Sequence, residues 1–475
     1  MKLSFIWTLF IFYSLTNCAQ SVAKPKGCAI EFLDKTFKNK TFYLASHYGK
    51  FQTLVDSVTA DAEGRLLFKN NEKYVGGIYM LVNDAKEIEI EFLMDEDQQF
   101  KIEPNKENPS RMTIYKSPQN IDFKDFNLFF KKKRAQIKEL NNSFEISKSK
   151  SEKVDYQKRI ETLEKEIVQY KQNYITSHSN TLALLFKLTQ PIGDYPLLGE
   201  KQKLPTKEDS ISYLKNNYFK GINFNDNRLL RNPFLESKLS TYFEVFVPKT
   251  VDAITKEIVD ILDLANTTNS EMFKYMSLYF MDLYMNPKKM GQDGIFLNLY
   301  NTYFRAQSYG WLPLAQKELF KSKARLLEHN QIGGKAKELF MNSIAGNPLN
   351  LYDLNTNYIV VVFWDPTCGH CQTEIPKINL LYKNEWKDIE VSIFAVNINS
   401  DVQTEWEEFI KTHKLKQWNH VSPATLVNGN FSQADVDYQT LYNIEQTPVF
   451  YLLDKEKTII AKDIDPTDYL KFMEQ

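Results

Sequence analysis

The segment from Tyr358 to Cys371 constrains the fold of this chain more than any other. Seven apolar residues, Tyr358-Ile-Val-Val-Val-Phe-Trp, are followed by Asp-Pro-Thr and then by Cys-Gly-His-Cys. A short continuous apolar run that ends in turn residues is typical of a strand buried on both faces. The sequence therefore predicts a buried strand, a tight turn and a helix that begins at Cys368.

The two cysteines of this segment have the spacing of a redox pair. Only the thiolate is nucleophilic, and a free thiol has a pKa of about 8.5. Unpaired N–H groups and the dipole at a helix start favour negative charge, so Cys368 is the predicted nucleophile with a lowered pKa. One helical turn brings Cys371 back toward Cys368, where it can resolve a mixed disulfide. His370 can add positive charge beside the thiolate, which makes the disulfide more oxidising.

A second signal is the proline in Gln446-Thr-Pro-Val-Phe, at the start of an apolar strand. Proline cannot donate a hydrogen bond to a neighbouring strand, so its place at the entry to a central strand needs an explanation. A cis peptide between Thr447 and Pro448 provides one.

Residues 1–19 have the layout of a secretory signal, with Lys2 before an uncharged apolar run over residues 3–15. The run is too short for a comfortable membrane span. Two processing routes compete. Cleavage after Ala19 would release a soluble chain, whereas Leu-Thr-Asn-Cys18 resembles a bacterial lipoprotein box in which Cys18 is lipidated and anchors the protein. Asn17 departs from the small residue that such boxes prefer.

Four cysteines in an exported chain are too few for a disulfide-stapled scaffold. Cys18 lies in the signal region. Cys28 alternates with Ile30 and Phe32 on one face of a predicted strand, which favours a buried inert thiol. The close pair at 368 and 371 therefore indicates a redox-active pair rather than a structural disulfide.

The length of 475 residues predicts several domains. Residues 27–120 carry short strands spaced as in an antiparallel β-sandwich. Residues 121–329 form an α-helical domain, in which apolar side chains recur at three-four spacing. Residues 330–475 have the order β-α-β-α…β-β-α of an α/β thioredoxin fold, with a β hairpin within 332–351. Strands are expected at residues 28–33, 41–45, 53–58, 65–68, 77–82, 87–92, 111–115, 358–364, 391–396, 448–453 and 458–460, and helices after residues 368, 401 and 466.

The charge of the chain gives no general case for nucleic-acid binding, because 59 basic and 60 acidic side chains nearly cancel. The basic run at residues 131–134 is explained by a solvated helix face.

The order of the three domains resembles multidomain thioredoxin-like proteins of Bacteroidetes. Gly77-Ile-Tyr-Met-Leu and Phe92-Leu-Met-Asp-Glu-Asp-Gln-Gln-Phe resemble their small N-terminal β domain, and the middle segment is similar to a family of unknown function. Cys371-Gln-Thr-Glu-Ile-Pro resembles the ResA/TlpA group of thiol–disulfide oxidoreductases. Cys-Gly-His-Cys is itself the active-site motif of protein disulfide isomerases.

The resemblance implies further site residues. Glu374 matches the acidic residue of the ResA/TlpA group that assists proton transfer at the inner cysteine. The loop at Thr447 and Pro448 would face the disulfide and offer backbone atoms to the substrate. Trp364 is assigned to the same substrate-binding surface, with packing around the site as the alternative. Val362 occupies the place of a buried Asp in thioredoxin, which strengthens the case for Glu374.

Thr367, directly before the motif, stands where thioredoxins usually carry Trp. Haem attachment would need His directly after the second cysteine, and Gln372 is there instead. Zinc would need four ligands, and no second Cys or His pair has suitable spacing.

Together these features predict an exported thiol–disulfide oxidoreductase of the periplasm or cell envelope that needs neither metal nor organic cofactor. Its expected partners are protein dithiols and disulfides and an upstream membrane or periplasmic redox protein. The direction stays open, because the resemblance implies a reductant while His370 favours oxidase or isomerase behaviour. The competing hypotheses are a structural disulfide and a cell-envelope binding or scaffold protein with a redox-sensing or structural thioredoxin-like domain.

Overall fold

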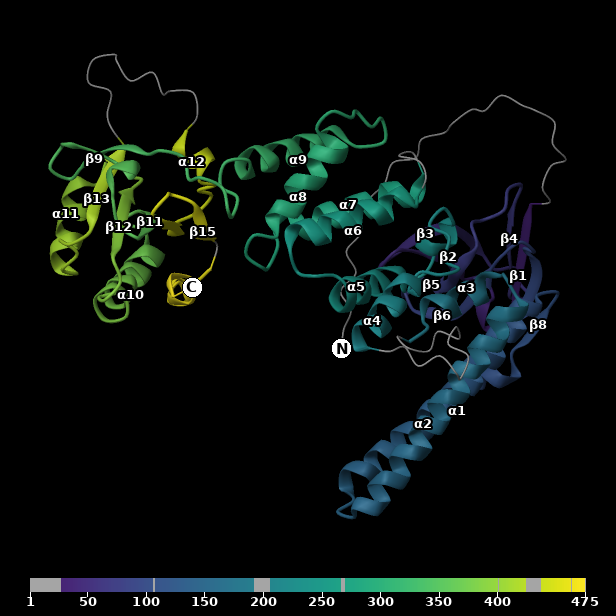
Figure 1. Ribbon diagram of the computed structural model, residues 1–475. Helices are drawn as coiled ribbons and strands as arrows, with labels where there is room; N and C mark the ends of the chain where they lie inside the picture. Colours follow the sequence, from purple (N-terminus) through teal and green to yellow (C-terminus); the bar gives the residue numbers. More distant parts are fainter. Residues whose placement is uncertain are drawn as a thin grey trace. The chain divides into compact units, whose positions relative to one another are not determined.

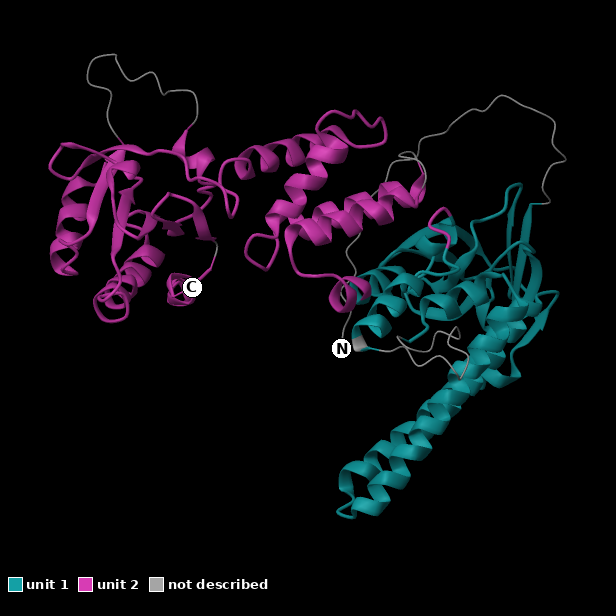
Figure 2. Cartoon of the chain, in the orientation of Figure 1, with its two compact units in different colours: residues 1–222, 226–241 teal, residues 223–225, 242–475 magenta. Residues whose placement is uncertain are grey.

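The structure is a computed structural model that describes residues 27–105, 107–191, 206–265, 270–399, 401–423, 437–462 and 464–474. The predicted signal segment, including Cys18, lies outside these residues. The chain forms two compact units, coloured separately in Figure 2: residues 1–222 with 226–241, and residues 223–225 with 242–475. The predicted domain boundaries at residues 120 and 329 stay predictions, because this division does not test them.

The first unit begins with two four-stranded sheets, as the strand spacing predicted (Figure 1). One has the order β4-β1-β7-β8 and the other β3-β2-β5-β6. All pairs are antiparallel except β1 with β7, whose parallel pairing is allowed by the long stretch of chain between them. The bounds are β1 Cys28–Leu33, β2 Thr41–Tyr48, β3 Phe51–Thr59, β4 Arg65–Asn70, β5 Gly77–Asn83, β6 Ile88–Met94, β7 Gln99–Glu103 and β8 Thr113–Tyr115.

The alternation predicted for β1 is confirmed. Cys28, Ile30 and Phe32 are all buried in one core between the sheets. Burial raises the pKa of the Cys28 thiol. A buried thiol with a raised pKa has little thiolate at neutral pH, so Cys28 fits the inert role predicted for it.

The sheets are followed by a long antiparallel helix pair, α1 with α2 (Figure 1). Near the sheet the pair shares an apolar cluster with β6 and α3, and farther out Ile137, Leu140, Ile160 and Ile167 form a second cluster between the two helices. The basic run at 131–134 lies on α1, where Lys133 pairs with Glu166. The helices are α1 Pro118–Ile146, α2 Lys150–Ser177, α3 Thr181–Leu188 and α4 Lys207–Asn217.

The second unit contains further helices and then the C-terminal sheet. The division between the units falls within α5. The helices before the sheet are α5 Leu235–Phe246, α6 Val251–Asp263, α7 Glu271–Met285, α8 Asp293–Leu299, the π-helix η4 Tyr300–Phe304 and α9 Leu314–Leu327.

The C-terminal sheet has seven strands in the order β10-β9-β13-β12-β11-β14-β15. β11 lies at its centre, parallel to β12 and antiparallel to β14. With its helices, this sheet confirms the predicted thioredoxin fold, and β9 with β10 forms the predicted hairpin. The bounds are β9 Phe340–Ser343, β10 Pro348–Asn350, β11 Tyr358–Trp364, α10 Gly369–Asn384, β12 Val391–Asn397, α11 Gln403–Thr412, β13 Asn419–Pro423, α12 Tyr438–Leu441, β14 Val449–Asp454, β15 Ile459–Lys462, the 3-10 helix η6 Pro466–Asp468 and α13 Leu470–Met473.

Strand β11 is buried on both faces because alternate side chains enter two different cores. Val360, Val362 and Trp364 face a core shared with α10 and α11. Ile359, Val361 and Phe363 face a second core on the opposite side. A continuous apolar run is the pattern required for such a strand.

Candidate active site

The turn after β11 places the two cysteines at the start of α10. The helix begins at Gly369, and Cys368 is its N-cap residue with extended backbone angles. The amide N–H of Cys368 donates to the carbonyl of Asp365 at 3.1 Å, which closes the turn. The strand, turn and helix predicted from the sequence are therefore present, with both thiols free.

Cys368 is the accessible sulfur of the pair. Its thiol makes no regular cap hydrogen bond, but nearby N–H groups favour the thiolate. The N–H of Cys371 contributes most to lowering the pKa of Cys368, the side chains of Thr447 and Cys371 and the N–H of His370 add to it, and partial burial opposes it. This is the electrostatic effect expected at a helix start.

Cys371 differs sharply from its neighbour. It is fully buried, in the core between the sheet and α10. Burial raises the pKa of its thiol to about 11, although the N–H of Asp365 favours the thiolate and opposes the rise. One helical turn thus holds two thiols with opposite pKa shifts.

The loop before β14 faces the outer sulfur. The Thr447–Pro448 peptide is cis, as the sequence predicted. The Cys368 sulfur lies 3.8 Å from the carbonyl oxygen of Thr447, to which its thiol donates. Both loop residues are half-buried, so part of the loop is open to solvent beside Cys368.

The remaining predicted residues take separate positions around the pair. His370 is exposed on α10. Its backbone N–H helps to lower the pKa of Cys368. Glu374 is half-buried one turn after Cys371, where its carboxylate accepts from Lys377 Nζ at 2.8 Å. Val362 is fully buried in β11.

Trp364 requires a correction. Its side chain is 0% exposed and packs against the ring of Phe409, with 5.1 Å between ring centroids. As the last residue of β11, it points into the layer between the sheet and the helices α10 and α11. A side chain in that layer cannot contact a docked protein, so the assignment to substrate binding is wrong and Trp364 has the packing role named as its alternative.

Two polar residues close to the sulfurs were missed by the sequence analysis. Asp365 accepts hydrogen bonds from the N–H and the hydroxyl of Thr367, both at 2.7 Å. Asn399, which follows β12, donates from Nδ2 to Asp365 Oδ2 at 3.0 Å. The tripeptide Asp-Pro-Thr did signal a turn, but nothing local pairs residues that lie 34 positions apart.

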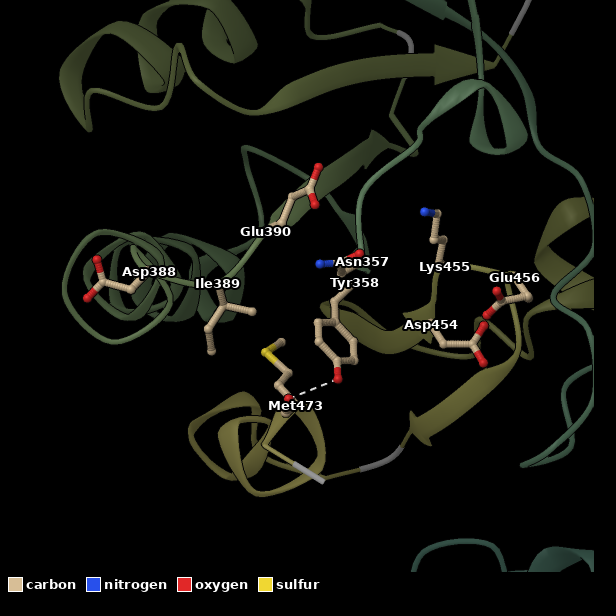
Figure 3. Close-up of a pocket in the computed structure, with 9 residues that line it drawn as sticks. All are labelled: Asn357, Tyr358, Asp388, Ile389, Glu390, Asp454, Lys455, Glu456 and Met473. Atoms are coloured by element: carbon tan, nitrogen blue, oxygen red, sulfur yellow. Dashed lines mark hydrogen bonds between the residues drawn. The ribbon is translucent and has the colours of Figure 1, made fainter.

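A cavity of about 520 Å³ lies near the opposite end of β11 (Figure 3). The ring of Tyr358, the first residue of the strand, points toward Met473, whose carbonyl accepts its hydroxyl at 2.8 Å. The sulfurs follow the last residue of this seven-residue strand, so about 20 Å of strand separates them from the cavity. The cavity is lined by Asn357, Tyr358, Asp388, Ile389, Glu390, Asp454, Lys455, Glu456 and Met473.

Within the described ranges, no group of three or more His, Cys, Asp or Glu side chains is arranged to bind a metal ion. Among the same residues, none of the helices combines the length and the apolar character needed to cross a bilayer.

Comparison with protein families assigns two segments of the chain. Residues 332–462 match the AhpC/TSA family, and residues 169–330 match a domain of unknown function, DUF5106. The first match covers the described thioredoxin-like sheet from the β9–β10 hairpin to β15. The second covers most of the helices that precede it.

The chain is also similar to curated relatives and to solved structures. The thiol–disulfide oxidoreductase ResA of Bacillus cereus is 26% identical over 137 residues, which are 29% of this chain and 72% of that protein. A domain of a possible thiol–disulfide isomerase from Cytophaga hutchinsonii is 35% identical, and the match covers 30% of this chain and 91% of that domain, with a TM-score of 0.26. A thioredoxin-like protein from Bacteroides caccae is 20% identical, with 59% and 96% covered and a TM-score of 0.44.

The AhpC/TSA match spans the segment that carries the cysteine pair at the end of a central strand, and the similar ResA proteins are thiol–disulfide oxidoreductases. The C-terminal segment is therefore a thioredoxin-like domain of the ResA/TlpA type of thiol–disulfide oxidoreductase.

Proposed function

We propose that this protein is an exported enzyme that exchanges disulfides with other proteins through Cys368 and Cys371. The observation that carries the proposal is the unequal state of the two thiols. The accessible one has a lowered pKa and faces the Thr447 carbonyl, whereas the buried one has its pKa raised to about 11.

The exchange takes place in two displacement steps. The Cys368 thiolate attacks one sulfur of a client disulfide, so that a mixed disulfide forms and the other client sulfur leaves as a thiolate. Cys371 then loses its proton and attacks Cys368, which forms the internal disulfide and releases the second client thiolate. Two electrons have moved from the enzyme to the client, and each released thiolate takes up a proton. The same steps in reverse oxidise a client dithiol.

Each thiol suits its step. The attacking group must be ionised before the client arrives, and the N–H groups around Cys368 favour that state. The resolving group must stay inactive until a mixed disulfide has formed beside it. Burial keeps Cys371 protonated until then, and Glu374 is the nearby carboxylate to which we assign proton transfer.

The client docks at the cis-proline loop. The Thr447 carbonyl already accepts from the Cys368 thiol, which supports an extended client segment passing the sulfur beside this loop. Backbone groups recognise many different sequences, which suits protein clients in general. His370 is exposed on the same helix start and tunes the reduction potential of the pair.

The test uses the full chain with insulin as the disulfide substrate. Wild type should reduce insulin in the presence of a thiol donor, and Cys368→Ser should lose all activity above the donor alone. Cys371→Ser should form the mixed disulfide but fail to release it, so client proteins can be identified from the trapped adducts. If wild type and Cys368→Ser reduce insulin equally, the proposal is wrong and the scaffold hypothesis gains support.

Export is the second part of the proposal and rests on the signal-like sequence of residues 1–19. Mass spectrometry of the mature protein from its native host distinguishes the two processing routes. A free N-terminus near Gln20 indicates signal cleavage, and a lipid-modified Cys18 indicates a membrane anchor. A chain that retains residues 1–19 in the cytoplasm would contradict export.

A further inference from the structure

Asp365 occupies a central place in the turn between β11 and α10. Its Oδ1 atom accepts from both the N–H and the hydroxyl of Thr367 at 2.7 Å. Its Oδ2 atom accepts from Asn399 Nδ2 at 3.0 Å. Burial opposes ionisation, but these hydrogen bonds outweigh it and lower the pKa of Asp365. The side chain is therefore a carboxylate with both oxygens bound.

Asn399 is itself held by the strand next to β11. Its N–H donates to Asn397 Oδ1 at 3.0 Å, and Asn397 is the fully buried last residue of β12. Asn397 pairs directly with Trp364, the last residue of β11. The two asparagines therefore connect the Asp365 carboxylate to the rigid end of the sheet.

The backbone of Asp365 meets both cysteines. Its carbonyl oxygen accepts from the Cys368 N–H at 3.1 Å, and its own N–H favours the thiolate of Cys371. A rotation of this one residue would move groups that act on both sulfurs. Hydrogen bonds from the side chain to Thr367 and Asn399 oppose that rotation.

We propose that Asp365, held by Asn399, is a positioning residue for disulfide exchange, which sets the geometry of both sulfurs through its backbone. The inference rests on the function proposed above and adds residues outside the cysteine motif to it. In the resolving step, a Cys371 S–H bond breaks, the new sulfur–sulfur bond to Cys368 forms, and the client sulfur leaves as a thiolate that takes up a proton. The fixed N–H of Asp365 stabilises the negative charge on Cys371 as its proton departs.

The chain contains a natural control for this inference. Asp465-Pro466-Thr467 repeats the tripeptide Asp365-Pro366-Thr367. Asp465 also accepts from the N–H and hydroxyl of its threonine, at 2.9 and 2.8 Å. This second turn opens the 3-10 helix η6 and is not part of the loop that carries the cysteines. Asp465→Ala removes the same local hydrogen bonds as Asp365→Ala without loosening the active-site turn.

The experiment measures the resolving step in the full chain with oxidised glutathione as the probe. Acid quenching and mass spectrometry follow the Cys368–glutathione mixed disulfide with time. We expect Asp365→Ala to slow its decay about tenfold, the size of effect of one hydrogen bond to a charged group. Asp465→Ala should match wild type within a factor of two, although it also removes two hydrogen bonds to a threonine.

A second readout is the equilibrium with reduced and oxidised glutathione. Loss of the positioned N–H groups disfavours the reduced pair, so in Asp365→Ala the equilibrium should move about tenfold toward the disulfide, which is about 30 mV to lower potential. Asn399→Leu should shift it in the same direction. The double variant Asp365→Asn with Asn399→Asp restores an amide–carboxylate hydrogen bond and should recover most of the wild-type value.

Failure of this inference is distinct from failure of the proposed function. If wild type and Asp365→Ala share the same decay rate and potential, Asp365 has only a structural role, while exchange by Cys368 remains intact. Shifts in Asp465→Ala as large as those in Asp365→Ala would likewise leave Asp365 with a structural role alone. If wild type itself forms no mixed disulfide with glutathione, the proposed function fails first, and this inference fails with it.

Discussion

Two regions of the C-terminal sheet bury ionisable side chains, one completely and the other only in part. On edge strand β15, Lys462 Nζ lies 2.5 Å from Asp293 Oδ2 and 2.9 Å from Asn330 Oδ1, and all three side chains are buried. At the end of central strand β11, Cys368 is accessible and Cys371 is buried. The first region contains an ion pair of opposite charges, whereas the second contains two thiols that differ in burial.

The comparison shows that buried ionisable groups can stabilise the fold in one region and prepare a reaction in another. Asp293 opens α8 and Asn330 follows α9, so the β15 network ties helices that precede the thioredoxin-like sheet to its edge. The charges of Lys462 and Asp293 compensate one another. The cysteine pair has opposite pKa shifts beside an accessible loop, which prepares one thiol for attack and holds the other back. Burial alone therefore does not mark a reactive group.

The largest effect is expected at β15. Lys462→Met leaves Asp293 buried without a counter-charge and should lower the free energy of unfolding by about 3–5 kcal/mol. The double variant Lys462→Met with Asp293→Leu removes both charges and should recover most of this loss. Tryptophan fluorescence during chemical denaturation of the full chain follows this unit, because apart from Trp7 every tryptophan lies in it. Equal stability of the single variant and wild type would contradict the structural role.

The next effect is the contrast in reactivity between the two thiols. Thiolate fraction rises with pH, so alkylation of Cys368, whose pKa is lowered, should reach half its maximum at a lower pH than for an ordinary thiol, while Cys371 requires a pH of about 11. At pH 7 this difference alone predicts that Cys368 reacts at least about a hundredfold faster. Iodoacetamide rates in Cys371→Ser and Cys368→Ser across pH provide the measurement. Parallel pH profiles for the two variants would remove the asymmetry on which the comparison depends.

The smallest effect is expected from Glu374. Its carboxylate is already paired with Lys377, so Glu374→Gln should slow resolution of the mixed disulfide by about two- to fivefold. Glu390→Gln is the matched control, because it removes an exposed carboxylate beside the cavity at the far end of β11. It should leave the rate within a factor of two. Equal effects of both variants would assign Glu374 to the solvated surface.

The features that could be predicted from the sequence are those encoded by neighbouring residues. The apolar run of β11, the turn and the helix start at Cys368 follow one another directly, and Pro448 marks the cis peptide by its place before β14. The strands of the first unit were also predicted, apart from β7. Strand β13 was missed because Asn419-His-Val-Ser-Pro is short and largely polar. It becomes a strand through its pairing with β12 and β9.

The sequence by itself determined the reactive pair and the fold around it, because periodicity, turn residues and helix starts are local properties of the chain. Tertiary structure alone decided the rest. It buried Trp364, joined Asp365 to Asn399 and brought Lys462 to Asp293, 169 positions away along the chain. The physical reason is that burial and polar pairing depend on which segments meet in space, and that is settled only when the sheet and its helices pack together.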